Sequence, residues 1–409
     1  MPFTYDLSEA TALTRALVAI KSYPGAEHAC QQAVAEWFVR HGMTPEIWQT
    51  SAAPNVIVKI HNGDGPTMLL NGHVDTVLAA EGWDCDPWEG RLDGDRLYGL
   101  GACDMKSGVV ANMLVTRAFA QHLDEWRGTL IFSSVVDEEA YSIGANAMIE
   151  QGMRADYCIV SESVHPTINI GATGKILVRA EVIGKAAHGF MPWQGINAAS
   201  EGAKFVTKVD ELPLGKHPRI PASQSILSFL SGSAQYVVTI PENAEILVSR
   251  QTVPGETREV VMQQMQAVVD GLNSPATFRL TTPPPYYPPF EIEPDHPLVT
   301  AMQHAYHDEW GNPAELRYST GVSDANLTAE LAHIPTLLYG PWGDNFHQCN
   351  EWVNLPSIVS CCNMFTAVIR KLLPAYLCPQ ERPTACCGAF SYTSDLFVCP
   401  CYAKTLVKV

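Results

Sequence analysis

Four short apolar runs lie along the chain between glycines and polar residues. Runs of this length that are rich in β-branched and aliphatic side chains predict buried strands. The four runs are residues 67–70, 129–136, 157–160 and 335–340. Each run is followed by a residue that can bind a metal, and in open α/β sheets ligands bind just beyond the carboxyl ends of the strands. The pattern therefore predicts that these polar residues gather around one point.

Helical patterns alternate with these predicted strands. Residues 55–60 predict a further strand, and residues 108–121 predict a helix with Val109, Val110 and Met113 on its buried side. Alternation of strands and helices is typical of an α/β fold. We therefore expect a mostly parallel sheet that is covered by helices on both faces.

The pattern changes near Lys175. The next segment predicts a strand, a helix, another strand, an amphipathic helix and a stiff proline-rich connector; these are residues 176–183, 197–211, 244–250, 261–272 and 282–289. This order favours a small α+β (ferredoxin-like) domain at residues 176–286. It would be inserted into a catalytic domain formed by residues 1–175 and 287–373, where the alternation resumes with a helix at 297–310, a strand at 335–339 and a helix at 356–373.

Composition narrows the class of partner. The chain has 409 residues, a formal net charge of -17 and 46% hydrophobic residues. The length predicts two domains. The acidity argues against nucleic acid or an anionic membrane as the main partner. No stretch has the apolar length of a membrane span, and Asp6 and Glu9 interrupt the start of the chain where a secretory signal would be apolar. We therefore expect a soluble, cytoplasmic protein.

The C-terminal residues 374–409 form a different kind of segment. They show no clear periodicity and contain Cys378, Cys386, Cys387, Cys399 and Cys401. The spacing of the last two cysteines does not fit a zinc ribbon or a CxxC redox motif. The tail is interpreted as a Cys-rich extension whose role is open.

The residues that follow the apolar runs are imidazoles and carboxylates. They are His73 and Asp75, Glu138 and Glu139, Glu162, and His347. Together with Asp104, in a glycine-rich loop before a predicted helix, they provide enough ligands for two metal ions that share a bridging carboxylate. Mixed nitrogen and oxygen ligands suit Zn2+, with Co2+ or Mn2+ as alternatives. The set predicts a hydrolytic site with two divalent metal ions.

Each residue alone also has an ordinary interpretation. A lone His-x-Asp motif or a lone loop histidine usually consists of ordinary surface residues. Asp104 could be a helix cap. Glu138 and Glu139 alone would suit an exposed acidic turn. However, adjacent carboxylates repel each other unless a cation or a proton intervenes. One of them could therefore bind a metal while the other acts as a general base.

The motifs in their order resemble the M20 metallopeptidases, and more narrowly the group of acetylornithine deacetylase and succinyl-diaminopimelate desuccinylase. The similar segments are residues 72–77, 98–108, 137–139, 161–162, 185–198, 321–326 and 346–347. The resemblance covers about residues 5 to 373 and excludes the tail.

The resemblance implies a role for each matching residue. Asp104 would bridge two metals, His73 and Glu162 would complete one site, and Glu139 and His347 the other. Glu138 would be the general base, and Asp75 would orient His73. A cis peptide would follow Asp104.

The resemblance also implies how substrate is held. His188 would reach the active site of a neighbouring subunit in a homodimer and stabilise the oxyanion that forms on the substrate carbonyl. Arg250 would bind the carboxylate of the substrate with help from Asn243, and Ser323, in the motif at 321–326, would also contact the substrate. Val248 and Asn326 depart from residues that are frequent in the family, which leaves the substrate open.

The function expected from this resemblance is cleavage of the amide bond of an N-acyl amino acid by an activated water, with a glutamate base. One alternative is a dipeptidase or carboxypeptidase of the same fold. A second is a non-catalytic relative that binds metal, which an intact Glu138 beside Glu139 argues against.

Overall fold

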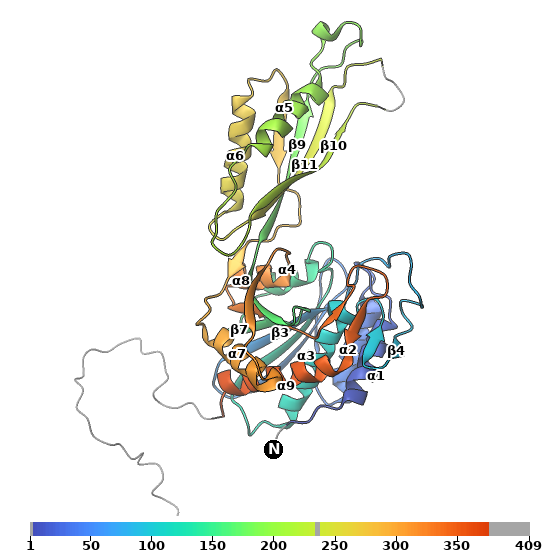
Figure 1. Cartoon of the computed structure of the whole chain (residues 1–409), viewed down its shortest axis with the longest axis vertical. Helices are drawn as coiled ribbons and strands as arrows, with labels where there is room; N and C mark the ends of the chain where they lie inside the picture. Colours follow the sequence, from blue (N-terminus) through green and yellow to red (C-terminus); the bar gives the residue numbers. More distant parts are fainter. Residues whose placement is uncertain (1–2, 234–237, 376–409) are drawn as a thin grey trace, which may run out of the picture. The chain divides into compact units, whose positions relative to one another are not determined.

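The computed structural model describes residues 3–233 and 238–375 (Figure 1). The Cys-rich segment predicted from residue 374 onward lies outside the described residues except for its first two positions. Within the described ranges, no helix is long and apolar enough to cross a membrane.

The central feature of the fold is a mixed sheet. Among the described residues, nine strands form it, in the order β1-β2-β6-β3-β7-β15-β8-β13, with β14 paired to β8. The strands are β1 Glu46–Trp48, β2 Asn55–Asn62, β3 Thr67–His73, β6 Gly128–Val135, β7 Tyr157–Val160, β8 Thr167–Ala172, β13 Phe290–Glu291, β14 Glu315–Ser319 and β15 Thr336–Leu338. The centre, β6-β3-β7-β15, is parallel, and antiparallel pairs flank it. The predicted α/β fold with a largely parallel sheet is confirmed.

Helices cover both faces of this sheet. They are α1 Leu7–Val18, α2 His28–Arg40, α3 Ser107–Gln121, α4 Ile143–Glu150, α7 Pro297–Trp310, α8 Asp324–Glu330 and α9 Leu355–Leu372. Successive side chains of a strand point to opposite faces. In β3, Met68 and Leu70 therefore pack into one core with α1, α2, α3, α7 and α9. Leu69 packs into the opposite core with α4 and α8.

Part of the predicted inserted segment forms a second, antiparallel sheet with the order β10-β11-β9-β12. Its strands and helices are β9 Gly174–Ile183, α5 Ala198–Asp210, β10 Ser223–Ser231, β11 Asn243–Thr252, α6 Arg258–Gly271 and β12 Thr277–Thr281, with a short 3-10 helix, η2 Pro192–Gln194. Phe205 of α5 and Met265 of α6 pack with the alternate residues of β9 and β11 in a separate core. Asn197 caps α5 through bonds from the amides of Ala199 and Ser200. The predicted elements of this segment are confirmed, and its division as a domain stays a prediction.

A small third sheet connects two loops that matter for the site. Its order is β16-β17-β5-β4, and its strands are β4 Arg91–Asp93, β5 Arg96–Tyr98, β16 Gly343–Asp344 and β17 Trp352–Asn354. The loop with Asp104 follows β5, and His347 lies between β16 and β17. Pairing of β17 with β5 therefore brings these two loops together although they are far apart in the sequence.

Candidate metal centre

The first part of the site lies where three parallel strands end. His73 is the last residue of β3, which pairs in parallel with β6 on one side and β7 on the other. Glu138 and Glu139 follow β6, and Glu162 follows β7. The Nε2 atom of His73 lies 3.6 Å from Oε1 of Glu162 and 3.9 Å from Oε2 of Glu138. The strand endings thus meet, as the sequence predicted.

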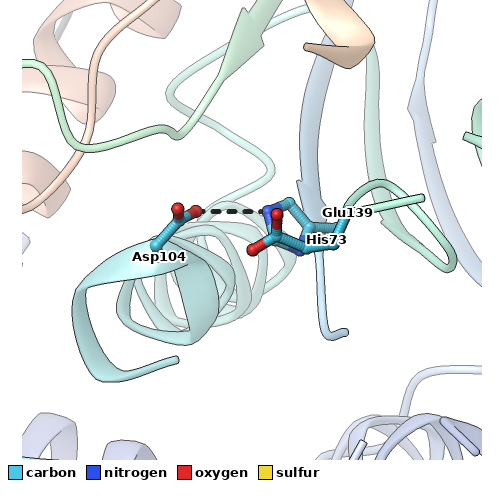
Figure 2. Close-up of side chains that lie close together, drawn as sticks. All are labelled: His73, Asp104 and Glu139. Carbon is cyan, nitrogen blue, oxygen red and sulfur yellow. Dashed lines mark ion pairs between the residues drawn. The ribbon is translucent and has the colours of Figure 1, made fainter. Parts of the chain in front are cut away.

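Asp104 comes from a loop rather than from a strand end. It lies in a kinked turn, η1 Ala102–Lys106, that precedes α3, and its own backbone angles, φ -116° and ψ 96°, are not helical. Its Oδ1 atom lies 3.4 Å from Nε2 of His73 (Figure 2), and its Oδ2 atom lies 3.2 Å from Nε2 of His347. One carboxylate therefore faces both imidazoles with separate oxygens. The predicted cis peptide between Asp104 and Met105 is confirmed.

A glycine allows this loop to approach the end of β7. Gly108 is the second residue of α3, and a Cβ atom there would lie 2.2 Å from the backbone oxygen of Ser161. Any larger residue would have to push the two segments apart. The contact keeps the Asp104 loop next to the residue that precedes Glu162.

His347 completes a second group of ligand-type atoms. Its Nε2 atom lies 3.0 Å from Oε1 of Glu139 as well as near Asp104. The ligand atoms of His73, Asp104 and Glu139 all lie within 4.8 Å of one another. The geometry thus contains two half-sites, one with His73 and Glu162 and the other with His347 and Glu139, and Asp104 lies between them.

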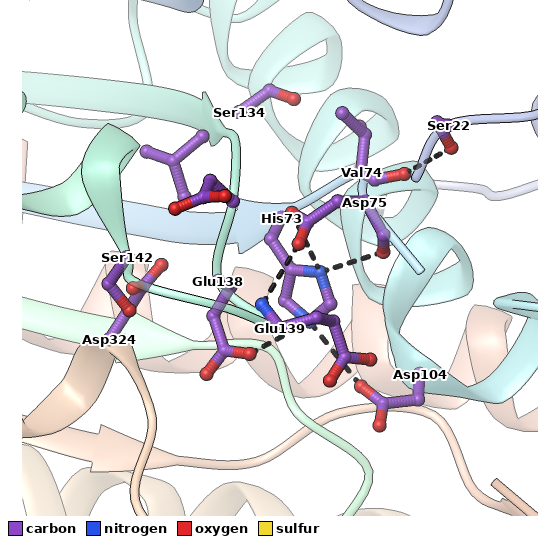
Figure 3. Close-up of polar contacts among 12 residues, drawn as sticks. Ser22, His73, Val74, Asp75, Asp104, Ser134, Glu138, Glu139, Ser142 and Asp324 are labelled. Atoms are coloured by element: carbon purple, nitrogen blue, oxygen red, sulfur yellow. Dashed lines mark hydrogen bonds and ion pairs between the residues drawn. The ribbon is translucent and has the colours of Figure 1, made fainter. Parts of the chain in front are cut away.

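Asp75 contacts the opposite nitrogen of His73. The Nδ1 atom lies 3.0 Å from the backbone oxygen of Asp75 and 3.4 Å from its Oδ1 atom (Figure 3). The Oδ2 atom of Asp75 accepts a 2.9 Å hydrogen bond from the amide of Glu139. A proton on Nδ1 leaves Nε2 free to bind a metal. Asp75 therefore links the orientation of His73 to the position of Glu139.

The electrostatics of the site call for additional positive charge. Burial, helped by neighbouring carboxylates, raises the pKa of Glu138 and of Glu162 well above the ordinary range. Burial opposes the charge of His73, but Asp75, Asp104 and Glu138 outweigh it and raise its pKa. Hydrogen bonds to Asp104 and Glu139 raise the pKa of His347 to about 10. These shifts share one physical cause, because several carboxylates crowd two imidazoles in a buried space where a cation would be stabilised.

One buried atom without a hydrogen-bond partner supports the presence of a metal site. Nε2 of His73 is buried and has no hydrogen-bond partner among the described residues, although three carboxylates lie within 3.9 Å. A buried polar atom without a partner is costly. Imidazole and carboxylate donors at this spacing suit divalent cations such as zinc. The residues present therefore fit the metal ions that the sequence predicted.

Two buried carboxylates near the centre had no predicted role. Glu351, 1% exposed, accepts hydrogen bonds from the amides of Gly101, Cys103 and Asp104 at 2.8, 2.8 and 3.0 Å. Burial raises its pKa to about 8. In the sequence, only its position four residues after His347 indicated that Glu351 lies near the site.

Asp324 is drawn beside Ser142, on the side of Glu138 that is away from Asp104 (Figure 3). Its Oδ2 atom accepts a 3.4 Å hydrogen bond from Nδ2 of Asn71, and its Oδ1 atom has no hydrogen-bond partner among the described residues. Burial raises its pKa to about 6. It belongs to the motif at 321–326, which gave a substrate role to its neighbour Ser323 and none to Asp324.

The predicted substrate residues are dispersed. Ser323 caps α8 and lines the cavity next to the carboxylates. Asn243 is exposed at the start of β11. His188 is exposed, and its contacts that the structure describes are local, to Phe190 and Thr239.

Arg250, which the resemblance implies would bind the substrate carboxylate, is buried in the second sheet. Its side chain is 0% exposed, and its guanidinium donates to Glu256 at 2.7 Å and to the backbone oxygen of Pro213 at 3.0 Å. A paired and fully buried guanidinium stabilises the second sheet. Its Nε atom has no hydrogen-bond partner among the described residues, but the side chain is fully buried and is not accessible to a ligand.

A cavity of about 450 Å³ opens beside the centre. Its lining comprises Asp104, Glu138, Glu139, Glu162, Ser163, Val164, Thr167, Asn169, Arg317, Tyr318, Ser319, Thr320, Val322, Ser323, Leu338, Phe346 and His347. This volume is in the range of sites for small molecules.

Comparison with known families and sequences gives consistent matches. The model of the family described as peptidase family M20/M25/M40 matches residues 69–371. A succinyl-diaminopimelate desuccinylase of Beijerinckia indica is 25% identical over 354 residues, which cover 83% of this chain and 91% of the relative. Another, of Variovorax paradoxus, is 27% identical over 394 residues, covering 90% and 98%.

Solved structures share the fold. A tripeptidase of Staphylococcus aureus has a TM-score of 0.74 at 22% identity and covers 89% of this chain and 98% of its own. A dinuclear metal binding peptidase of Bacillus subtilis has a TM-score of 0.70 at 18% identity, covering 90% and 98%. At these identities the likeness shows the fold alone.

Proposed function

The chain belongs to peptidase family M20/M25/M40, and on that premise we propose that it is a two-metal amidohydrolase that cleaves the amide bond of N-acyl amino acids. The observation that carries the proposal is the position of Asp104, whose two oxygens face His73 and His347 separately at 3.4 and 3.2 Å. A carboxylate in this position is suited to bridge two cations, and Glu138 lies beside it.

The ligands of the proposed site follow from the two half-sites. His73, Glu162 and Asp104 would hold one ion, and His347, Glu139 and Asp104 the other. Nitrogen and oxygen donors favour Zn2+, with Co2+ or Mn2+ as alternatives. When bound, such ions lower the pKa of a water molecule and polarise a substrate carbonyl.

Glu138 is proposed as the general base. Its carboxylate is 11% exposed and lies 3.9 Å from His73, on the same side as the cavity. It would take the proton of the attacking water and pass it to the leaving amine. Asp75 would hold the Nδ1 proton of His73, so that Nε2 stays available to bind a metal ion. Burial raises the pKa of Glu138, which strengthens its carboxylate as an acceptor of the water proton.

The segment 176–286 is proposed as a lid and dimerisation domain. His188 of a partner subunit would then donate to the developing oxyanion, where a fixed donor is most effective. The exposure of His188 supports this proposal because the imidazole is accessible to another chain. Asn243 and Ser323 are proposed to contact the substrate.

Relatives named succinyl-diaminopimelate desuccinylase favour an N-acyl amino acid over a longer peptide. The test is a hydrolysis assay with protein reconstituted with Zn2+, Co2+ or Mn2+, using N-succinyl and N-acetyl amino acids and unmodified dipeptides. We expect amide cleavage of N-acyl amino acids that is lost on chelation. Exclusive cleavage of dipeptides would replace the proposal by a peptidase function. Absence of cleavage with every substrate and metal would support a non-catalytic metal-binding protein.

A further inference from the structure

The cavity beside the metal-type residues contains an arginine that no predicted role includes. Arg317 lies on β14, at the edge of the central sheet. Among the described residues that line the cavity, it is the only arginine or lysine. Its neighbours in the lining are mostly hydroxyl or amide side chains, such as Thr167, Asn169 and Ser319. Arg317 therefore brings a guanidinium to a polar part of the lining, whereas Asp104, Glu138, Glu139 and Glu162 bring carboxylates to it.

The register of the sheet sets the separation between Arg317 and these carboxylates. Val160, two residues before Glu162, pairs with Leu338, which pairs with Asn169, which pairs with Arg317. The four residues form one row across β7, β15, β8 and β14. Neighbouring strands lie about 4.8 Å apart, so three steps place Arg317 about 14 Å from Val160 along the row.

The side chains at the two ends span part of this distance. Leu338, Asn169 and Arg317 all line the cavity, which therefore follows the row. An extended chain covers about 3.5 Å per residue. A ligand of about two residues therefore covers about 7 Å of the roughly 14 Å, and the extended side chains of Arg317 and Glu162 would have to cover the rest.

The present partner of Arg317 is a weak one. Its Nη2 atom lies 3.0 Å from Oε2 of Glu315, and the two side chains are 60% and 63% exposed. An ion pair between exposed side chains contributes little, about 0–1 kcal/mol. A ligand carboxylate could replace Glu315 at little cost, and arginine offers two parallel donors for a carboxylate.

Arg250, expected from the sequence to bind the substrate carboxylate, is fully buried and paired with Glu256. We propose that Arg317 instead binds a free carboxylate of the substrate that is remote from the cleaved amide. The substrate class is then an elongated N-acyl amino acid or dipeptide with an anionic end. This inference rests on the proposed function, because it assumes that the amide is cleaved at the carboxylate cluster.

The test compares a substrate that has the free carboxylate with its carboxamide analogue, on metal-reconstituted protein. The variant Arg317→Gln should lower the ratio of kcat/KM for acid over amide by about tenfold, mainly through KM, as expected for loss of a charged hydrogen bond. Arg317→Lys should keep part of the preference. Arg40→Gln is the matched control, because Arg40 also pairs with a glutamate on the surface, at 3.9 Å, outside the cavity.

Each outcome bears on the proposal. A ratio that falls in Arg317→Gln and not in Arg40→Gln supports it. A ratio that stays the same, or that falls equally in both variants, overturns it while the amidohydrolase function stands. Wild-type protein that cleaves neither substrate would instead overturn the proposed function.

Discussion

The carboxylate of Glu351 accepts a 3.0 Å hydrogen bond from the backbone amide of Asp104. Two further amides of the same loop donate to this carboxylate, which is 1% exposed. Glu351 thus fixes the backbone of the residue whose oxygens face both histidines. Since groups behind a ligand orient it, Glu351 is expected to govern both half-sites together.

Glu351→Gln should weaken both metal sites. An amide in place of the carboxylate puts a donor against a backbone donor, so at least one of the three hydrogen bonds is lost. We expect metal affinity to fall about 10–100-fold for both ions, because Asp104 is common to both half-sites. Isothermal titration with Zn2+ measures this. Glu201→Gln is the control, since Glu201 is also buried but lies on α5. Unchanged affinity in Glu351→Gln would contradict the role.

Asp75→Asn should affect the half-site of His73 more than that of His347. Asn keeps a similar shape but removes the charge that holds the Nδ1 proton. The expected loss is about 10–100-fold in the affinity of one ion. Asp156→Asn is a suitable control because Asp156 binds the amide of Thr67 at the opposite end of β3. Equal loss in the two variants would mean that the effect comes from the stability of the strand.

His347→Ala should reduce the metal content of the protein from two ions to about one. His347 contacts Glu139 and Asp104, whereas the half-site of His73 and Glu162 keeps its own ligands. Elemental analysis after dialysis gives the stoichiometry. His61→Ala, on β2, controls for general loss of histidine. Retention of both ions in His347→Ala would exclude His347 as a ligand.

The stability of the metal-free protein should fall as pH rises. His347 has a pKa raised from 6.5 to about 10, so its contribution is complete below pH 6.5 and is lost as pH approaches 10. The raised pKa values of Glu138 and Glu162 act in the same direction, because folding favours their protonated forms and disfavours the ionised forms above their ordinary pKa of 4.5.

Metal binding requires deprotonated ligands. The increase in Tm on adding Zn2+ should therefore be larger at about pH 8 than at about pH 6. Melting curves with and without metal at the two pH values provide the comparison. An increase in Tm that is the same or smaller at the higher pH would argue that the clustered carboxylates and histidines do not bind the metal.

The positions of the site residues could be predicted where the backbone pattern determines them. His73, Glu138 and Glu162 follow runs that are strands in a parallel sheet, and parallel strands place their endings on one side. Asp104 and His347 come from loops, and the pattern named them as candidate ligands without predicting how close together they lie. Their approach depends on the pairing of β17 with β5, which joins residues some 250 positions apart and has no local signal.

Burial was the property that the sequence did not reveal. Arg250 lies on β11, where alternate residues face the core of the second sheet, and its pairing with Glu256 follows from a turn. Glu351 and Asp324 look like ordinary surface carboxylates in the sequence, because three-dimensional neighbours supply their hydrogen bonds. The position of Arg317 in the row that leads to the end of β7 depends on the register between strands, which has no local signal in the sequence.

The most direct measurement is the turnover of metal-reconstituted Glu138→Gln together with its metal content. Glu138 faces the cavity, and neither half-site requires it as a ligand. A general base contributes about 10²–10⁴-fold to the rate. The account predicts that both ions stay bound while kcat for an N-acyl amino acid falls by at least about a hundredfold. Turnover close to wild type with both ions bound would contradict it.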